Sequence, residues 1–239
     1  MHIRVWARTT RLLPAVAAGL AAGLLAGCAG SVRPDGPAPR PKAAASAPVR
    51  PRDCCVAATP SPAQRAIART AAAFVGARRV EARGRRLPFD CSGLARAVYL
   101  RHGVDLYDGV ETGDAANGVR LIYRHVASRG VVHEGPDARP GDIVFFHNTW
   151  DRNGDGRVND LLTHVGIVER VERDGTVVFV SRVSRGIERY RMNLARPGVH
   201  RTRDGRVLND FLRRKRRSDP AHTRYLAGEL FAGFGRLAD

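Results

Sequence analysis

One cysteine and one histidine occupy positions from which they could take part in covalent chemistry. Cys91 lies in the stretch FDCSGL (residues 89–94), which leads into an apolar pattern typical of a helix. Asp90 fits the N-cap position, which places Cys91 in the first turn, where the helix dipole favours a thiolate. His164 lies in the apolar run THVGIV (residues 163–168), which predicts a core strand. The pair offers a thiol nucleophile with an imidazole base, and the alternative is a structural cysteine and a hydrogen-bonded core histidine.

The elements that must position this pair follow a simple order, helices first and strands after. Ser61 and Gln64 form a capping-box pattern with Pro62 at the first helical position, and Asp174-Gly175 is a hairpin-turn pair. Helices are expected at residues 62–75, 91–102 and 118–128, a basic loop at 77–88, and strands at 143–146, 163–171, 176–181 and 187–192. This order predicts an α+β fold in which N-terminal helices pack on an antiparallel sheet.

The C-terminal part has a weaker pattern. Residues 213–217 are a run of five basic side chains, which is typical of a solvated face or of a phosphate-contacting patch. Asp219-Pro220 is a helix-start signal, so a terminal helix is expected after it. Its packing face would be Tyr225, Leu226, Leu230 and Phe231.

The N-terminus has the features of an export signal. Arg4, Arg8 and Arg11 precede an apolar stretch, residues 12–26, that is too short to span a membrane. The segment ends in LAGC, which resembles a bacterial lipobox and implies cleavage of residues 1–27 and diacylglycerol on Cys28. An ordinary secretory signal is the alternative. No acidic residue follows the cysteine directly, which favours the outer membrane and a location in the cell envelope.

Residues 28–61 are expected to be an extended tether, because prolines alternate with Ala and Arg and no apolar pattern repeats. Cys54 and Cys55 interrupt this segment. Adjacent cysteines rarely form a bond with each other without strain, so the sequence leaves their partners open.

The chain is strongly basic, with a net charge of +17 at pH 7. Such a charge often indicates nucleic-acid binding, but the export signal argues against that partner. Lipid phosphates or an anionic wall polymer fit an exported, lipid-anchored chain better.

Three motifs together resemble the NlpC family of bacterial cell-wall cysteine peptidases. They are DCSGL (residues 90–94), PGDIVFF (residues 140–146) and THVGIV (residues 163–168), in that order and spacing. The resemblance covers residues 62–195 and implies a papain-like fold. Residues 196–239 would then be a basic C-terminal extension with a terminal helix.

The resemblance also implies roles for individual residues. Cys91 would be the nucleophile and His164 the general base, while Asp90 and Ser92 would contact the free amine of a peptide stem. The implied substrate is a peptidoglycan stem peptide, typically cleaved between D-Glu and diaminopimelate, and no cofactor is required. Ser181 occupies the position of the third catalytic residue, which is usually His or another polar group in the family.

Ser181 is shorter than histidine and uncharged, so two other functions stay open. A wall-binding lipoprotein with a weakened site is one of them. The other is an acyltransferase or amidase that uses the same cysteine and histidine on a different amide or on a lipid.

A second set of polar residues lies in the insertion before His164. Asp151, Asn153 and Asp155 match the opening of a Ca²⁺ loop, and Asn159 or Asp160 could supply a closing ligand. Leu162 stands where such loops carry a bidentate Glu. The alternative is an Asx- and Gly-rich turn without metal. Bound Ca²⁺ would stabilise the strand that carries His164.

Overall fold

The computed structural model describes residues 59–110 and 117–237. The expected signal peptide, Cys28, Cys54, Cys55 and nearly all of the tether lie outside these residues. None of the helices within residues 59–110 and 117–237 is long and apolar enough to cross a membrane.

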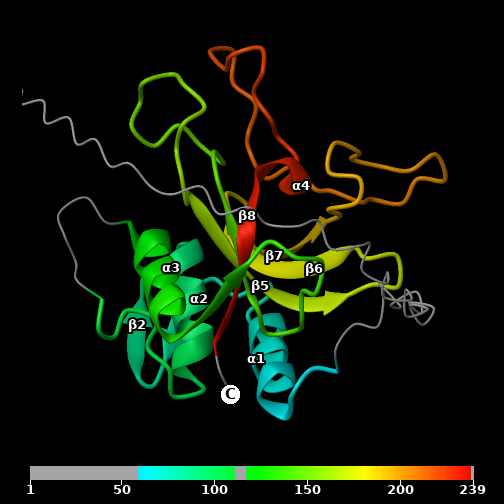
Figure 1. Cartoon of the computed structure of the whole chain (residues 1–239). Coiled ribbons are helices and arrows are strands. Elements are labelled where there is room, and N and C mark those ends of the chain that lie inside the picture. Colours follow the sequence, from blue (N-terminus) through cyan, green and yellow to red (C-terminus); the bar gives the residue numbers. More distant parts are fainter. Residues whose placement is uncertain (1–58, 111–116, 238–239) are drawn as a thin grey trace, which may run out of the picture. The chain divides into compact units, whose positions relative to one another are not determined.

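Four helices and eight strands make up the described part of the chain. In chain order they are α1 (Pro62–Ala73), β1 (Val80–Ala82), β2 (Arg85–Leu87), α2 (Cys91–Leu100), α3 (Gly118–Arg129), β3 (Gly130–His133), β4 (Ile143–Phe146), β5 (His164–Val171), β6 (Val177–Val183), β7 (Gly186–Met192), α4 (Ala227–Leu230) and β8 (Phe231–Leu237). Six strands form one sheet in the order β3-β8-β4-β5-β6-β7, and every neighbouring pair in it is antiparallel. The predicted α+β class with an antiparallel sheet is confirmed (Figure 1).

Each of the first three helices begins at the cap residue that its sequence provides. Ser61 and Gln64 form the reciprocal capping box of α1. The side chain of Asp90 accepts a hydrogen bond from the backbone N–H of Gly93 in α2, and that of Asn117 accepts one from Arg120 in α3. Cys91 is therefore the first residue of α2, as predicted.

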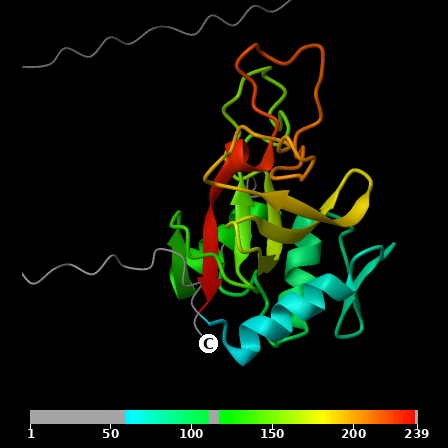
Figure 2. The ribbon, with the colours of Figure 1, turned by 90° about the vertical axis from the view of Figure 1, so that its right-hand side faces the viewer.

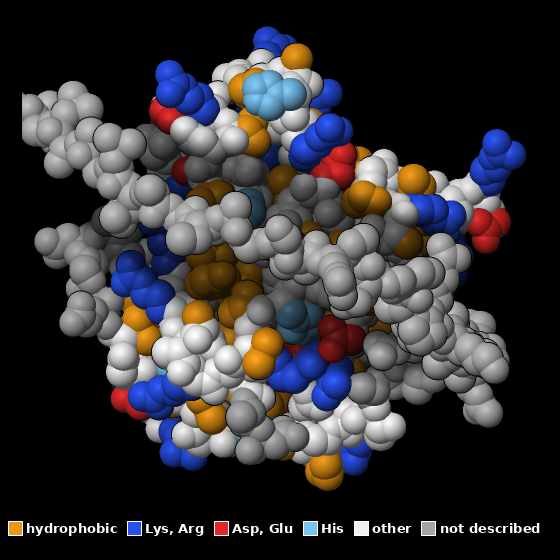
Figure 3. Space-filling view, in the orientation of Figure 1, with side chains coloured by type: hydrophobic (Ala, Val, Ile, Leu, Met, Phe, Trp, Pro, Cys, Tyr) orange, Lys and Arg blue, Asp and Glu red, His pale blue; other side chains and the backbone are white. Residues whose placement is uncertain are grey.

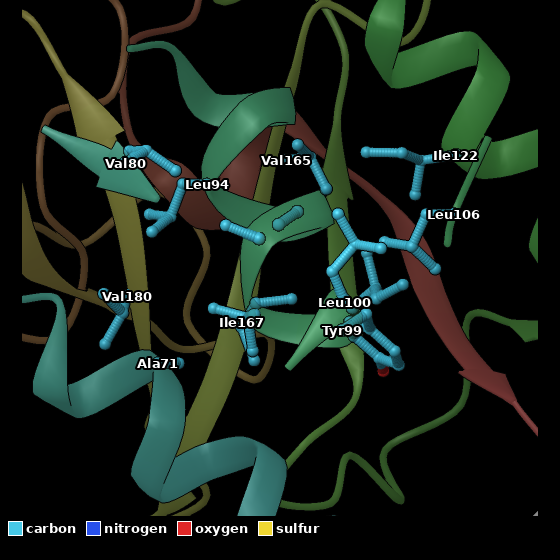
Figure 4. Packing of buried hydrophobic residues seen from close by; sticks show 14 of the residues in the cluster. Ala71, Val80, Leu94, Tyr99, Leu100, Leu106, Ile122, Val165, Ile167 and Val180 are labelled. Carbon is cyan, nitrogen blue, oxygen red and sulfur yellow. The ribbon is translucent and has the colours of Figure 1, made fainter. Parts of the chain in front are cut away.

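The central strand β4 is buried on both of its faces, and its alternating side chains enter two different cores. Ile143 and Phe145 belong to the first core, which also holds the apolar faces of α1, α2 and α3. Figure 4 shows Leu94 and Tyr99 of α2 close to Val165 and Ile167 of β5 in this core. Val144 and Phe146 belong to the second core, on the opposite face of the sheet.

The predicted C-terminal extension with a terminal helix is wrong. Only residues 227–230 are helical, and residues 231–237 form β8, which pairs with β3 on one side and with β4 on the other. Leu212, Leu230 and Phe234 complete the second core. A domain boundary at residue 195 would remove a strand from the middle of the sheet, which is visible where red β8 runs beside green strands (Figures 1 and 2).

Residues 77–88 are also more ordered than the predicted basic loop. They contain the hairpin β1–β2, whose turn residues Arg83 and Gly84 both have positive φ angles, 48° and 71°. Val80, Ala82 and Leu87 are buried and join the first core, so this hairpin covers part of α2. The short strand β3 was not predicted either.

The basic run at 213–217 does not form a uniform solvated face. The Arg213 side chain is buried, where its guanidinium lies 2.7 Å from the Asp219 carboxylate and donates to the backbone carbonyl of Asn148. The other four residues of the run are exposed. Basic side chains are spread over the face seen in Figure 3, with few acidic ones between them.

Candidate active site

The start of α2 presents the Cys91 thiol at the protein surface. Gly93 in the first turn passes so close to the preceding chain that a Cβ there would lie 2.1 Å from the carbonyl oxygen of Pro88. Glycine at position 93 thus lets the chain turn sharply into the helix. Cys91 is half-buried, and it is free of any disulfide among the described residues.

His164 opens β5, and Ser181 of β6 fixes its protonation pattern. The Ser181 hydroxyl donates its only proton to the carbonyl of Val165, at 2.6 Å. It lies 2.8 Å from His164 Nε2, so it must accept there, and Nε2 carries the proton. Nδ1 is then the unprotonated nitrogen that can act as a base. Ser181 is completely buried, so it positions the imidazole and does not itself reach the groove.

Cys91 and His164 line one groove, of about 1090 Å³, together with Asp90 and Ser92. The backbone of Val165, the residue after His164, hydrogen-bonds with the Cys91 sulfur and lowers the pKa of the thiol. The structure therefore brings the candidate nucleophile, Cys91 of α2, and the candidate base, His164 of β5, to the wall of the same groove. A polar groove with a thiol and an imidazole on its wall can carry out acyl transfer.

Burial decides the protonation of both groups. Desolvation raises the pKa of the Cys91 thiol to about 11, and the backbone hydrogen bonds from Val165 and Ser92 offset only part of that effect. Desolvation and the nearby Arg182 charge lower the pKa of His164 to about 4. Desolvation thus opposes the thiolate that the helix start favours, and it also favours the neutral form of His164.

The pH dependence of turnover follows from these two values. Catalysis needs His164 neutral, so kcat/KM is expected to fall only as the pH drops through about 4, not near the ordinary histidine value of 6.5. Alkylation of Cys91 by iodoacetamide should accelerate as the pH rises toward about 11. A pH–rate profile and an alkylation series check both statements, and an acid limb centred at 6.5 would contradict them.

Asp90 and Ser92 form a small polar network on the groove wall. The Ser92 hydroxyl donates to the Asp90 carboxylate at 2.8 Å, and it also hydrogen-bonds with the Tyr107 hydroxyl. Both hydroxyls pack against Gly118, where a Cβ would lie 2.2 Å from Tyr107 Oη and 2.4 Å from Ser92 Oγ. Arg96 lies over the Tyr107 ring, 4.4 Å from its centroid, and so holds the ring in place.

The far side of the groove comes from the insertion before His164 and from the C-terminal segment. Trp150 and Phe211 lie there, and these residues are 48 % and 59 % exposed. The buried Arg213 joins the two segments, because it binds Asn148 of the insertion and Asp219 of the C-terminal segment. This wall could not have been expected from a domain that ends at residue 195.

Three of the four predicted Ca²⁺ ligands, Asp151, Asn153 and Asp155, are engaged in hydrogen bonds within the loop itself. Asp151 accepts hydrogen bonds from the backbone N–H groups of Gly154 and Gly156, and Asp155 accepts from one backbone N–H and two side-chain amides. The Asn153 oxygen accepts from the Asp155 N–H. Asp160 differs, because its backbone hydrogen-bonds with Asn148 while its buried Oδ2 has no hydrogen-bond partner among the described residues.

Across residues 59–110 and 117–237, no group of three or more His, Cys, Asp or Glu side chains could hold a metal ion. The oxygens of Asp151 and Asn153 accept backbone N–H groups of the loop, as in an Asx- and Gly-rich turn. Calcium binding stays a prediction, which a calcium titration followed by thermal unfolding tests.

Two residues at the site, Tyr107 behind the groove wall and Arg182 on it, were not expected from the sequence. Tyr107 lies in an irregular segment without a motif, and its position behind Ser92 depends on packing against Gly118. Arg182 follows Ser181 directly and, like many other arginines of this basic chain, had no feature that distinguished it. Comparison of the sequence with models of known families gave no match, and comparison with curated proteins gave none either.

Proposed function

We propose that this chain is a cysteine peptidase of the cell envelope with a papain-like NlpC fold, which cleaves peptidoglycan stem peptides. The observation that carries the proposal is the Ser181–His164 hydrogen bond behind a groove that Cys91 shares with His164. This arrangement supplies a nucleophile, a base and a group that orients the base.

The chemistry begins from the neutral pair. Cys91 Sγ attacks the carbonyl carbon of the scissile amide while its proton moves to His164 Nδ1, which becomes an imidazolium. Backbone N–H groups at the start of α2 stabilise the oxyanion that forms. The imidazolium then protonates the departing amine, and the acyl group stays on sulfur as a thioester. A water molecule gives a proton to Nδ1 and attacks the thioester carbonyl. The C–S bond then breaks, the imidazolium returns the proton to sulfur, and the carboxylic acid leaves.

Asp90 and Ser92 support the proposed recognition of a free amine. The Asp90 carboxylate lies on the groove wall beside the nucleophile, and its oxygens accept hydrogen bonds from Ser92 and from the backbone of Gly93. An ammonium group that enters the groove would find a negative charge there. The proposed substrate is thus a stem peptide with a free amino end, typically cleaved after D-Glu.

The proposed location rests on the sequence at the N-terminus. A lipid on Cys28 would hold the protein at a membrane of the envelope, and the proline-rich tether would let the catalytic part reach the wall. Metabolic labelling with a palmitate analogue, compared between the wild type and Cys28→Ala, tests this anchor.

The decisive experiment for the function is a digest of purified peptidoglycan, read by mass spectrometry. The expected result is a set of new stem-peptide fragments whose masses identify the cleaved bond. Fragments that carry an added amine or alcohol in place of water would indicate an acyltransferase. Binding to the wall without any new fragment would favour the non-catalytic alternative.

Ser181→Ala gives a sharper test of the positioning role. Loss of the hydroxyl leaves the buried Nε2–H of His164 without its acceptor, so kcat is expected to fall about 10- to 100-fold with little change in KM. Ser218→Ala, which removes the same hydroxyl from an exposed turn outside the groove, is the matched control and should keep the wild-type kcat. If both variants keep the wild-type kcat, Ser181 does not orient the base.

A further inference from the structure

A second hollow, of about 260 Å³, adjoins the groove on the Phe89 side. Arg182, Arg185 and Glu188 line both spaces, so the same side chains face the hollow and the groove. Arg78 also lines the smaller hollow. Three arginines against one glutamate leave this end of the groove with a positive charge.

The three arginines of this hollow lack acidic partners among the described residues. Arg78, Arg182 and Arg185 form no ion pair within residues 59–110 and 117–237, whereas Arg189 on the same groove is paired with Glu169 at 2.6 Å. The glutamate of the hollow, Glu188, instead accepts a hydrogen bond from Tyr190. Unpaired guanidiniums inside a concave surface are suited to bind an anion.

Arg182 has the geometry for this role. Its guanidinium carbon lies 4.8 Å from the centroid of the Phe89 ring, so the ring holds the group by a cation–π contact. Its Nε is buried and has no hydrogen-bond partner in the part of the chain that the structure describes. A guanidinium whose face rests on an aromatic ring still presents the N–H groups of its edges, and these match the two oxygens of a carboxylate.

The position of Arg182 connects this site to catalysis. Arg182 follows Ser181 in β6, it lines the same groove as His164, and its charge contributes to the lowered pKa of that histidine. An anion bound at Arg182 would therefore lie beside the reacting amide.

We propose that Arg182, with Arg78 and Arg185 beside it, binds a free carboxylate of the substrate next to the scissile amide. This inference rests on the proposed peptidase function and adds its specificity: the preferred substrate is a peptide whose acidic residue keeps a free carboxylate near the cleaved bond. The bound carboxylate would offset the Arg182 charge, so the pKa of His164 would rise toward its ordinary value in the complex.

The test uses two synthetic stem peptides that differ only in one group, a free carboxylate or a carboxamide on the D-Glu residue. Binding of each is measured by calorimetry in the Cys91→Ala protein, which holds the peptide without cleaving it, and in the same protein with Arg182→Gln. The carboxylate peptide is expected to bind about tenfold more weakly after Arg182→Gln, while the carboxamide peptide is expected to bind equally to both proteins.

Arg173→Gln is the matched control, because it removes the same charge from an exposed turn outside the groove. Equal weakening by Arg173→Gln would mean that only the overall charge matters, and equal weakening of both peptides by Arg182→Gln would exclude a carboxylate subsite. Failure of the carboxylate peptide to bind also overturns the inference. Failure of the proposed peptidase function gives a different result. In that case the wild type cleaves neither peptide, although the preference for the carboxylate peptide can still appear in binding.

Discussion

Replacement of Cys91 by alanine is expected to lower the rate of stem-peptide cleavage by about 10³-fold or more, because every bond change of the proposed reaction passes through the Cys91 sulfur. The effect should appear in kcat, and substrate binding should persist because Asp90, Ser92 and the groove walls stay in place. The measurement is a steady-state assay with a synthetic stem peptide.

The fold should tolerate this change. Cys91 is half-buried at the first position of α2, where the Asp90 cap and not the thiol stabilises the helix start, and alanine is a good helix former. Circular dichroism and thermal unfolding of Cys91→Ala should therefore match the wild type. Cleavage by this variant at more than about a tenth of the wild-type rate would contradict a nucleophilic role for Cys91.

Removal of residues 196–239 is expected to abolish cooperative folding. The truncated chain would lose β8, which separates β3 from β4 in the sheet, and would lose the side chains that close the second core. It would also leave the buried Asp142 carboxylate without Arg236, whose guanidinium donates to it at 2.7 and 3.0 Å. A buried charge without a partner and a sheet with an unpaired centre are each strongly destabilising.

Thermal unfolding followed by circular dichroism checks this expectation, with a chain that ends at Leu237 as the control. The control keeps all of β8 and should unfold in one sharp transition like the wild type. If the chain that ends at Ala195 instead unfolds in a sharp transition at the wild-type temperature, residues 196–239 are not required for the fold.

Features set by a few adjacent residues could be predicted from the sequence. The caps Ser61 and Asp90 decide where α1 and α2 begin, and the alternation of residues 187–192 matches β7. Cys91, His164 and Ser181 lie in or beside such elements, and so their grouping follows from the order of helices and strands.

The strand β8 could not be predicted because its amino-acid composition is untypical of a strand. Residues 231–237 contain Gly233 and Gly235, and glycine is rare in strands. Close packing explains Gly235, since a Cβ there would lie 2.9 Å from the Phe145 ring and from Val126. That requirement comes from residues about 90 to 110 positions away, which no local pattern reports.

The protonation of Cys91 could not be predicted for a related reason. The helix start, which favours a thiolate, is visible in the sequence, whereas the desolvation that raises the pKa to about 11 comes from the packing around β5. The same packing holds His164 neutral, so the pair is set for a proton transfer during the attack and not before it.

The measurement that tests the central claim most directly is the mass of the intact protein during turnover. Wild-type protein is mixed with a stem peptide, quenched in acid within the first turnovers and analysed by mass spectrometry, with Cys91→Ala in parallel. The account predicts an adduct equal in mass to the acyl part of the peptide, located on the fragment that contains Cys91 and absent from the variant. Cleavage by the wild type without any adduct, together with undiminished cleavage by Cys91→Ala, would contradict it.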